Sequence, residues 1–182
     1  MGGNLSLTTS WSKLGPKSVL KILIVLKNKK IKGLNKLQRW RDFVSEIIKN
    51  YFNDISVNMS ATYEKQITHD DVQAFADISG AHNPIHLDEN FAKDSIFGER
   101  VAHGMLTASH ISAALVNFAG PGWLYVNQSL YFRAPVRIGD TVTTQVKVEK
   151  CLSLKHLVEL STESRVVDKI VLTGTATIKS PD

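Results

Sequence analysis

The most constraining feature of the sequence is one helix-length segment that is apolar around almost its whole circumference. It runs from His103 to Gly120 and reads HGMLTASHISAALVNFAG. Side chains that face nearly all sides of a helix are typical of an element in the middle of a fold. The ones that carry this pattern are Met105, Leu106, Ile111, Ala114, Leu115 and Phe118. Gly120-Pro121-Gly122 ends the segment. The rest of the chain must therefore surround this helix.

Four segments with alternating apolar and polar residues follow the helix and predict four strands, at 124–132, 140–150, 156–167 and 169–179. We expect turns at 135–140, at 151–155 and at Val167-Asp168. A weaker alternation over Thr62–Ile67 predicts one strand ahead of the helix. The pattern indicates an α+β fold in which a curled antiparallel sheet wraps round one long buried helix. Such a sheet leaves edges and apolar surface open, so we expect a homodimer.

Two shorter helices are predicted between the first strand and the buried helix. Thr68 and Asp71 have the spacing of a capping box and start the first one. Ser79-Gly80 ends it, a loop with Pro84 follows, and a second short helix is expected near 88–93. The residues expected on the buried face of the first helix are Val72, Phe75, Ala76 and Ile78.

The net charge of +5 is unevenly distributed along the chain. Residues 1–60 hold 11 Lys and Arg against 3 Asp and Glu, whereas residues 61–182 hold 11 against 14. The second part is therefore mildly acidic, which argues against nucleic-acid binding. The single cysteine, Cys151, excludes an internal disulfide and favours a reducing compartment, the cytoplasm. No apolar run approaches the roughly 20 residues of a membrane span.

Residues 1–59 form a basic N-terminal extension, with the folded domain expected over 60–182. Steps of three and four between apolar residues predict an amphipathic helix at about 33–52. Four interpretations stay open. The helix docks on its own domain; the natural chain starts at Met59; the segment targets the mitochondrial matrix; or it makes peripheral contact with a lipid or polymer-granule surface.

The loop before the buried helix carries histidines and an Asn-Pro turn, in FADISGAHNPIHLDENFA, residues 75–92. Two further blocks follow in order, VAHGMLTASHIS (101–112) and YFRAPVRIGDTV (131–142). Together they resemble the MaoC-like family of (R)-specific enoyl-CoA hydratases and 3-hydroxyacyl-thioester dehydratases, which have the hot-dog fold. The resemblance covers residues 61–180.

The resemblance implies reversible addition of water across the trans-2,3 double bond of an acyl thioester. It makes His86 the catalytic histidine and gives Gly104 the backbone N–H that polarises the thioester carbonyl. It makes Ser112 the residue that orients a catalytic aspartate, which the family has where this chain has Ala81. The residues expected to contact substrate are Asn83, Pro84, His103 and Met105.

The resemblance implies no cofactor, because CoA is part of the substrate. We also expect no metal ion: Pro84 interrupts the spacing between His82 and His86, and no cysteine or clear carboxylate completes a ligand set. His82 is expected to be exposed, although it adjoins Ala81 and is a candidate replacement base. His110 is expected in the core or a groove, and Asp140 in a turn. Arg133 and Arg137 are both candidates for phosphate contacts.

Ala81 leaves three explanations open. The alanine was introduced to trap a complex, or it is natural and His86 with a water sustains slow turnover, or the chain is a non-catalytic acyl-thioester-binding relative. The expected activity is hydration of trans-2-enoyl-CoA to (R)-3-hydroxyacyl-CoA, impaired by Ala81. The alternative is a 3-hydroxyacyl-carrier-protein dehydratase, so the expected partner is an acyl-CoA or acyl-carrier-protein thioester.

Overall fold

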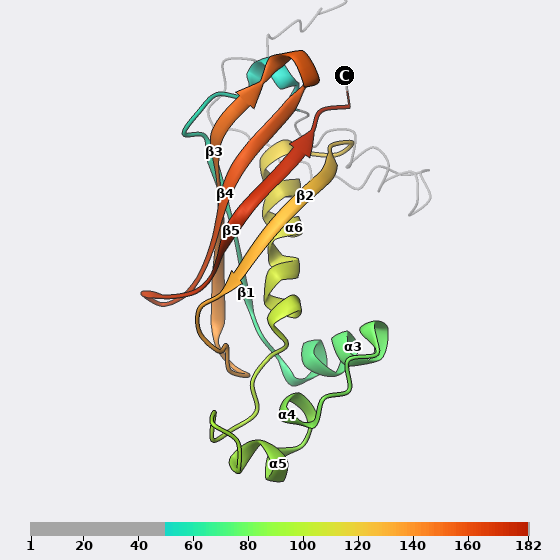
Figure 1. The fold of residues 1–182 in the computed structure, drawn as a ribbon, viewed down its shortest axis with the longest axis vertical. Coiled ribbons are helices and arrows are strands. Elements are labelled where there is room, and N and C mark those ends of the chain that lie inside the picture. Colours follow the sequence, from blue (N-terminus) through green and yellow to red (C-terminus); the bar gives the residue numbers. More distant parts are fainter. Residues whose placement is uncertain (1–49, 182) are drawn as a thin grey trace, which may run out of the picture. The chain divides into compact units, whose positions relative to one another are not determined.

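The computed structural model describes residues 50–181. Its long helix is α6 (Gly104–Ala119), and its five strands are β1 (Ser60–Gln66), β2 (Leu124–Phe132), β3 (Thr141–Leu152), β4 (Leu157–Val166) and β5 (Lys169–Lys179). Three short helices precede α6: α3 (His69–Ser79), α4 (Pro84–Leu87) and α5 (Glu89–Lys93). Two 3-10 turns, η2 (Phe52–Asp54) and η3 (Ser153–Lys155), complete the described elements. Figure 1 shows α6 lying along the sheet.

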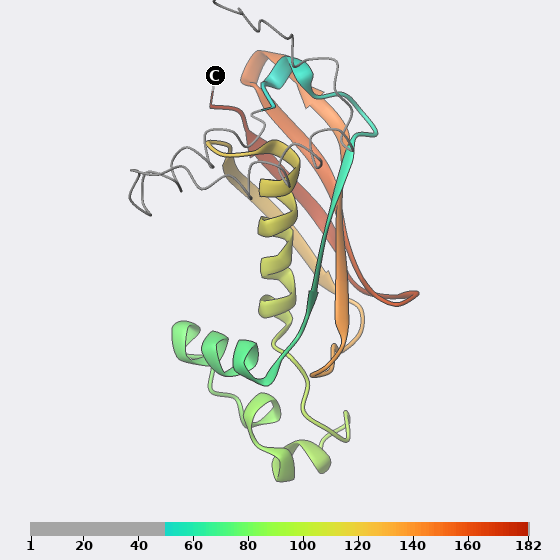
Figure 2. The same ribbon diagram turned by 180° about the vertical axis from the view of Figure 1, so that it is seen from behind.

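The strands form one antiparallel sheet in the order β1-β3-β4-β5-β2. Each consecutive pair in that order is antiparallel, so the predicted sheet is confirmed. The sheet curls along one side of α6, as the two opposite views show (Figure 1 and Figure 2). β1 and β2 are its two edges. The core lies between helix and sheet, where Ile111, Ala114, Val146 and Leu160 are at most 1% exposed.

The expectation that α6 is buried on nearly all sides is wrong for the isolated chain. Met105 is 53% exposed and Val116 is 54% exposed, and Ser109 and Ser112 are also exposed. The reason is geometric, because the sheet covers only one side of the helix. α6 therefore keeps an apolar face that no other described element of this chain covers.

The strand boundaries agree with the prediction to within two residues. β3 runs on to Leu152, which pairs with Leu157 of β4 across η3, so the predicted turn at 151–155 is shorter than expected. The turn at Val167-Asp168 is confirmed, and Asp140 lies in a turn where its carboxylate accepts a hydrogen bond from the Arg137 N–H at 2.7 Å.

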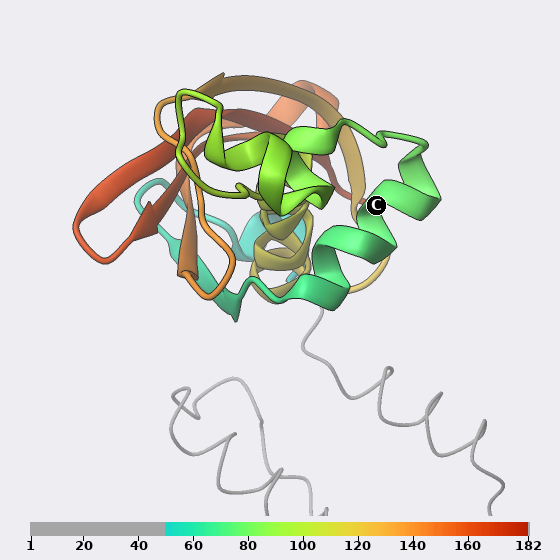
Figure 3. The same cartoon turned by 90° about the horizontal axis from the view of Figure 1, so that it is seen from below.

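The segment between β1 and α6 folds into α3, α4 and α5, which gather at one end of α6 (Figure 3). The capping box of Thr68 and Asp71 is confirmed, and Gly80 ends α3 with a φ of 73°. Val72 and Ala76 are buried, but Ile78 is 87% exposed, so its predicted place in the core is wrong. It lies in the last turn of α3, away from the face that packs on the domain.

The core extends further toward the N-terminus than the predicted boundary at residue 60. Phe52 and Ile55 are both 7% exposed and belong to the core cluster. The Trp123 indole N–H donates to the Asn50 carbonyl at 2.9 Å, and the Met59 carbonyl accepts from the Val148 N–H at 2.8 Å. The predicted amphipathic helix at 33–52 lies outside the described residues except at 50–52, where Tyr51 is extended and Phe52 begins η2.

The interpretations of residues 1–49 also lie outside the described part of the chain. Within residues 50–181, no helix combines the length and the hydropathy needed to cross a membrane.

Removing the segment before Met59 tests its structural role. A chain lacking residues 1–58 loses Phe52 and Ile55, and burial of such a side chain contributes roughly 1.5–3 kcal/mol. We expect its free energy of unfolding in urea to fall by about 3 kcal/mol or more. A chain lacking residues 1–49 keeps these contacts and is the matched control. Equal unfolding midpoints for the two truncated chains would contradict the assignment of Phe52 and Ile55 to the core.

Candidate active site

The first turn of α6 presents backbone N–H groups without a side-chain cap. His103 is the N-cap residue, but its side chain makes no capping hydrogen bond. The first N–H groups of a helix have no intrahelical partner and carry the positive end of its dipole. A Cβ at Gly104 would lie 2.7 Å from the Phe132 ring, so any other residue there would displace that ring. This helix end can accept an oxygen atom that carries partial negative charge.

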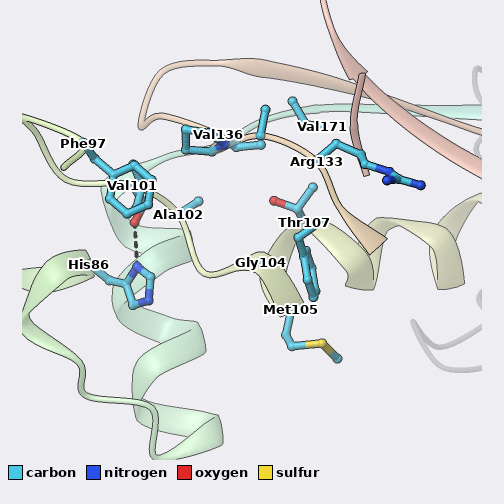
Figure 4. A pocket seen from close by; sticks show the side chains of 13 residues that line it. His86, Phe97, Val101, Ala102, Gly104, Met105, Thr107, Arg133, Val136 and Val171 are labelled. Atoms are coloured by element: carbon cyan, nitrogen blue, oxygen red, sulfur yellow. Dashed lines mark hydrogen bonds between the residues drawn. The ribbon is translucent and has the colours of Figure 1, made fainter. Parts of the chain in front are cut away.

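His86 is held beside this helix end by the loop that α4 forms. Asn83 caps α4 by accepting from the Ile85 N–H at 3.2 Å, and Pro84 is its first residue. The prediction of an irregular loop around Pro84 therefore missed this short helix, in which proline takes the first position. His86 Nδ1 lies 2.8 Å from the Val101 carbonyl oxygen (Figure 4). A carbonyl only accepts, so Nδ1 carries the proton and Nε2 keeps its lone pair.

A second histidine links the loop to α6. His103 is 4% exposed, and its Nε2 donates to the Ala81 carbonyl at 2.9 Å. Its ring lies 3.9 Å from that of His86, centroid to centroid, and 5.1 Å from that of Phe75. The backbone of Ala81 is thus tied to the start of α6. The methyl group of Ala81 stands in the loop position for which the sequence led us to expect a carboxylate.

The environment of His86 keeps its ring neutral. Burial lowers the pKa of His86 below its ordinary value of 6.5, and the neighbouring His103 lowers it further. The Val101 carbonyl works in the opposite direction without reversing the shift. At neutral pH, Nε2 is therefore a hydrogen-bond acceptor and a base.

A cavity of about 490 Å³ adjoins His86 and the first turn of α6. This volume is within the ordinary range for small-molecule sites. Its polar side chains are His86, Thr107 and Arg133. The other lining residues are apolar apart from Gly104: Phe97, Val101, Ala102, Met105, Phe132, Ala134, Pro135, Val136 and Val171. Such a cavity suits an apolar chain with one polar end.

The structure brings together some of the predicted site residues and separates others. His86, Gly104 and Met105 line the cavity, while Ala81 and His103 lie directly beside it. Asn83 and Pro84 are exposed and shape α4. Ser112 lies eight residues after Gly104, about 12 Å along the helix, on the exposed face. A single chain therefore does not gather Ser112 into the cavity.

The structure also distinguishes between Arg133 and Arg137, the two candidates for phosphate contacts. Arg133 lines the cavity, with its Nε 3.1 Å from the Thr173 hydroxyl, whereas Arg137 forms an ion pair with Glu99. His82 is exposed. Among residues 50–181 no group of three metal-ligating side chains occurs. Thr107 and Phe132 were missed, although they lie in the blocks 101–112 and 131–142 that the sequence singled out.

His110 is buried in α6, as expected. It is 4% exposed, and neither ring nitrogen has a hydrogen-bond partner within the described residues. Its ring meets Tyr63 of β1 edge-on at 5.6 Å. This histidine packs away from the cavity.

A curled five-stranded antiparallel sheet along one long helix is the hot-dog fold, which the solved structures of similar proteins share. Residues 53–170 match the MaoC like domain. The chain belongs to this family.

Two curated relatives cover most of the described chain. An (R)-specific enoyl-CoA hydratase of Rhodospirillum rubrum is 45% identical over 137 residues, covering 75% of this chain and 95% of the relative. A 3-hydroxybutyryl-CoA dehydratase of Methylorubrum extorquens is 45% identical over 132 residues, which cover 72% of this chain and 84% of the relative. Among solved structures, the unliganded R-hydratase PhaJ1 of Pseudomonas aeruginosa is 37% identical with a TM-score of 0.69. The match covers 72% of this chain and 86% of the solved chain.

The protonation state of His86 can be tested directly. We expect NMR of ¹⁵N-labelled imidazoles at pH 7 to report a proton on Nδ1 and none on Nε2, and a titration midpoint below 6.5. The pKa of His86 is lower in the folded chain than in the unfolded chain. The contribution of His86 to the free energy of unfolding is therefore present above pH 6.5, and it is lost as the pH falls below 6.5 through the folded pKa. His86→Ala identifies the resonance. A midpoint at or above 6.5 would contradict the described environment.

Proposed function

We propose that this chain binds trans-2-enoyl-CoA and converts it reversibly, with low turnover, to (R)-3-hydroxyacyl-CoA. One observation carries the proposal: the cavity is lined both by His86, whose Nε2 is free, and by Gly104 at the uncapped start of α6. The first group suits activation of a water, and the second suits the oxygen of a thioester. The names of the relatives support the same chemistry.

The proposed steps balance with one water and no cofactor. The thioester carbonyl oxygen accepts from the N–H groups of the first turn of α6. Nε2 of His86 takes a proton from the water as its oxygen bonds to carbon 3. The π electrons of the double bond move toward the carbonyl oxygen, which becomes an enolate. Carbon 2 then takes a proton from the imidazolium, and the neutral ring is restored.

Ala81 explains why turnover should be low. A carboxylate at this position would accept a hydrogen bond from the second O–H of the water and so fix the orientation of the water, while a methyl group does not. Loss of one member of a catalytic acid–base pair typically costs roughly 10²–10⁴ in rate. His86 then acts alone on a loosely held water.

The same residue favours a second candidate function, that of a non-catalytic acyl-thioester-binding protein. In that case the cavity retains its ligand but no water is activated. Acyl-CoA and acyl-carrier-protein thioesters share the reacting group, so a 3-hydroxyacyl-carrier-protein dehydratase remains the alternative within the enzymatic class.

We propose a cytoplasmic location, with the mitochondrial matrix as the alternative.

Restoring the carboxylate separates the enzymatic proposal from the binding one. We expect Ala81→Asp to raise kcat for crotonyl-CoA hydration by about 10²–10⁴. The measurement is loss of the enoyl-thioester absorbance. Ala81→Asn is the matched control, because it has similar size but no base.

Adding His86→Ala to Ala81→Asp should lower the rate to that of the starting chain or below it, because His86 takes the proton of the water. A gain below tenfold in Ala81→Asp, with crotonyl-CoA still bound, would support the non-catalytic reading.

We also propose that the chain forms a homodimer. The exposed apolar face of α6, with Met105 and Val116, is accompanied by exposed apolar residues on the edge strand β2: Leu124, Tyr125, Val126, Tyr131 and Phe132. Met105 and Phe132 also line the cavity, so this surface borders the site. A second copy would cover the surface and would meet Ser112, which lies on the same helix.

The dimer has a matched pair of tests. Light scattering after size exclusion should give twice the mass of one chain. Val116→Glu places a charge on the exposed face of α6 and should give a monomer. Val167→Glu makes the same change in the β4–β5 turn, at a position 86% exposed, and should leave the dimer intact. A monomeric starting chain, or equal effects of the two substitutions, would overturn the assignment.

A further inference from the structure

Thr107 has the one buried hydroxyl group on the cavity wall that the described structure leaves without a hydrogen bond. The residue is 3% exposed, and its Oγ1 has no partner within residues 50–181. Its backbone N–H is already used, since it donates to the His103 carbonyl at 3.2 Å. A threonine in a helix commonly bonds back to a carbonyl one turn earlier, but this one does not. An unpaired buried polar group requires an explanation.

The position of the hydroxyl group indicates what it would bind. Thr107 lies three residues after Gly104, and helical side chains tilt toward the N-terminus, so Oγ1 lies over the first turn of α6. Figure 4 shows the oxygen directed toward the side of the cavity on which Ala102 and His86 are drawn. A ligand oxygen at the N–H groups of α6 would therefore lie within reach of this hydroxyl as well.

The other cavity walls favour the same ligand group. Around Thr107 the lining is apolar, from Ala102, Val136 and Val171. The Arg133 Nε donates to the Thr173 hydroxyl, and the guanidinium group lies over the Tyr131 ring at 5.2 Å. The cavity thus offers a hydroxyl donor and the α6 N–H groups to one acceptor, while its two other polar side chains are His86 and Arg133. In an enoyl-CoA, the acceptor next to the reacting carbons is the thioester carbonyl oxygen.

We propose that the Thr107 hydroxyl donates a second hydrogen bond to the thioester carbonyl oxygen, beside the bond from the start of α6. This inference rests on the proposed function and names a further substrate-contacting residue for it. When water adds to carbon 3, negative charge moves onto that oxygen, and a hydroxyl donor stabilises it there. On this proposal, the Thr107 hydroxyl group that is unpaired within residues 50–181 finds its partner when the ligand binds.

The experiment compares two ligands and two variants by calorimetry, using the full chain with Ala81. The ligands are crotonyl-CoA and but-2-enyl-CoA, a thioether in which CH₂ replaces the carbonyl. Thr107→Val keeps the shape and removes the hydroxyl, and Thr107→Ser keeps the hydroxyl. We expect Thr107→Val to weaken crotonyl-CoA binding about tenfold and to leave the thioether within about twofold. Thr107→Ser should keep the preference for crotonyl-CoA.

A second readout distinguishes a ligand contact from a structural role. Removing an unpaired buried hydroxyl should raise the Tm of the free chain, so Thr107→Val gains stability as it loses affinity. If Thr107→Val weakens both ligands equally, or neither, the role of Thr107 is refuted while the proposed function stands. If the starting chain binds neither ligand, the proposed function fails as well.

Discussion

The packing of one side of α6 into the curled sheet is the contact on which the rest of the structure depends. Ile111 and Ala114 of the helix are buried against strand residues such as Val146 and Leu160. This contact fixes where the helix begins, and the first turn is the part that adjoins the cavity. The histidine loop is tied to the same point, through Val101 to His86 and through Ala81 to His103. Both halves of the candidate site therefore follow from the placement of one helix.

Much of the fold was predictable because alternation and helical periodicity directly reflect which side chains are buried. The strands, α3 with its capping box, and the end of α6 at Gly120 all follow from such local patterns. The errors occurred where burial depends on partners far along the chain. Ile78 has the polarity of a core residue but nothing to pack against, and Met105 lies on a face the sheet does not reach.

The candidate site was predictable only in part. The spacing of Asn83, Pro84 and His86 and the His-Gly pair at the start of α6 marked the cavity by their likeness to a family. Thr107 lies in the family-like block 101–112 but was not singled out, because a threonine inside an apolar helix resembles any small core residue. Its importance depends on an unpaired atom and on the cavity beside it, and both are properties of the folded chain.

In the proposed function, Ala81 separates ligand binding from the hydration step. The backbone at this position still holds the loop to α6, and the pKa of His86 is still lowered by burial, so the cavity and its base do not depend on the missing carboxylate. In the proposed reaction, the methyl group removes the second contact to the attacking water. The central claim is therefore that an enoyl thioester binds with its carbonyl at the start of α6, whether or not it then reacts quickly.

The proposed slow turnover would make that claim directly observable. Infrared difference spectroscopy of crotonyl-CoA carrying ¹³C at the thioester carbonyl reports the polarisation of this bond in the bound state. We predict a shift of the carbonyl stretch to lower wavenumber than in water, because the helix dipole and hydrogen-bond donors draw electrons onto the oxygen. A bound ligand whose carbonyl stretch is unshifted, or moves to higher wavenumber, would contradict the account.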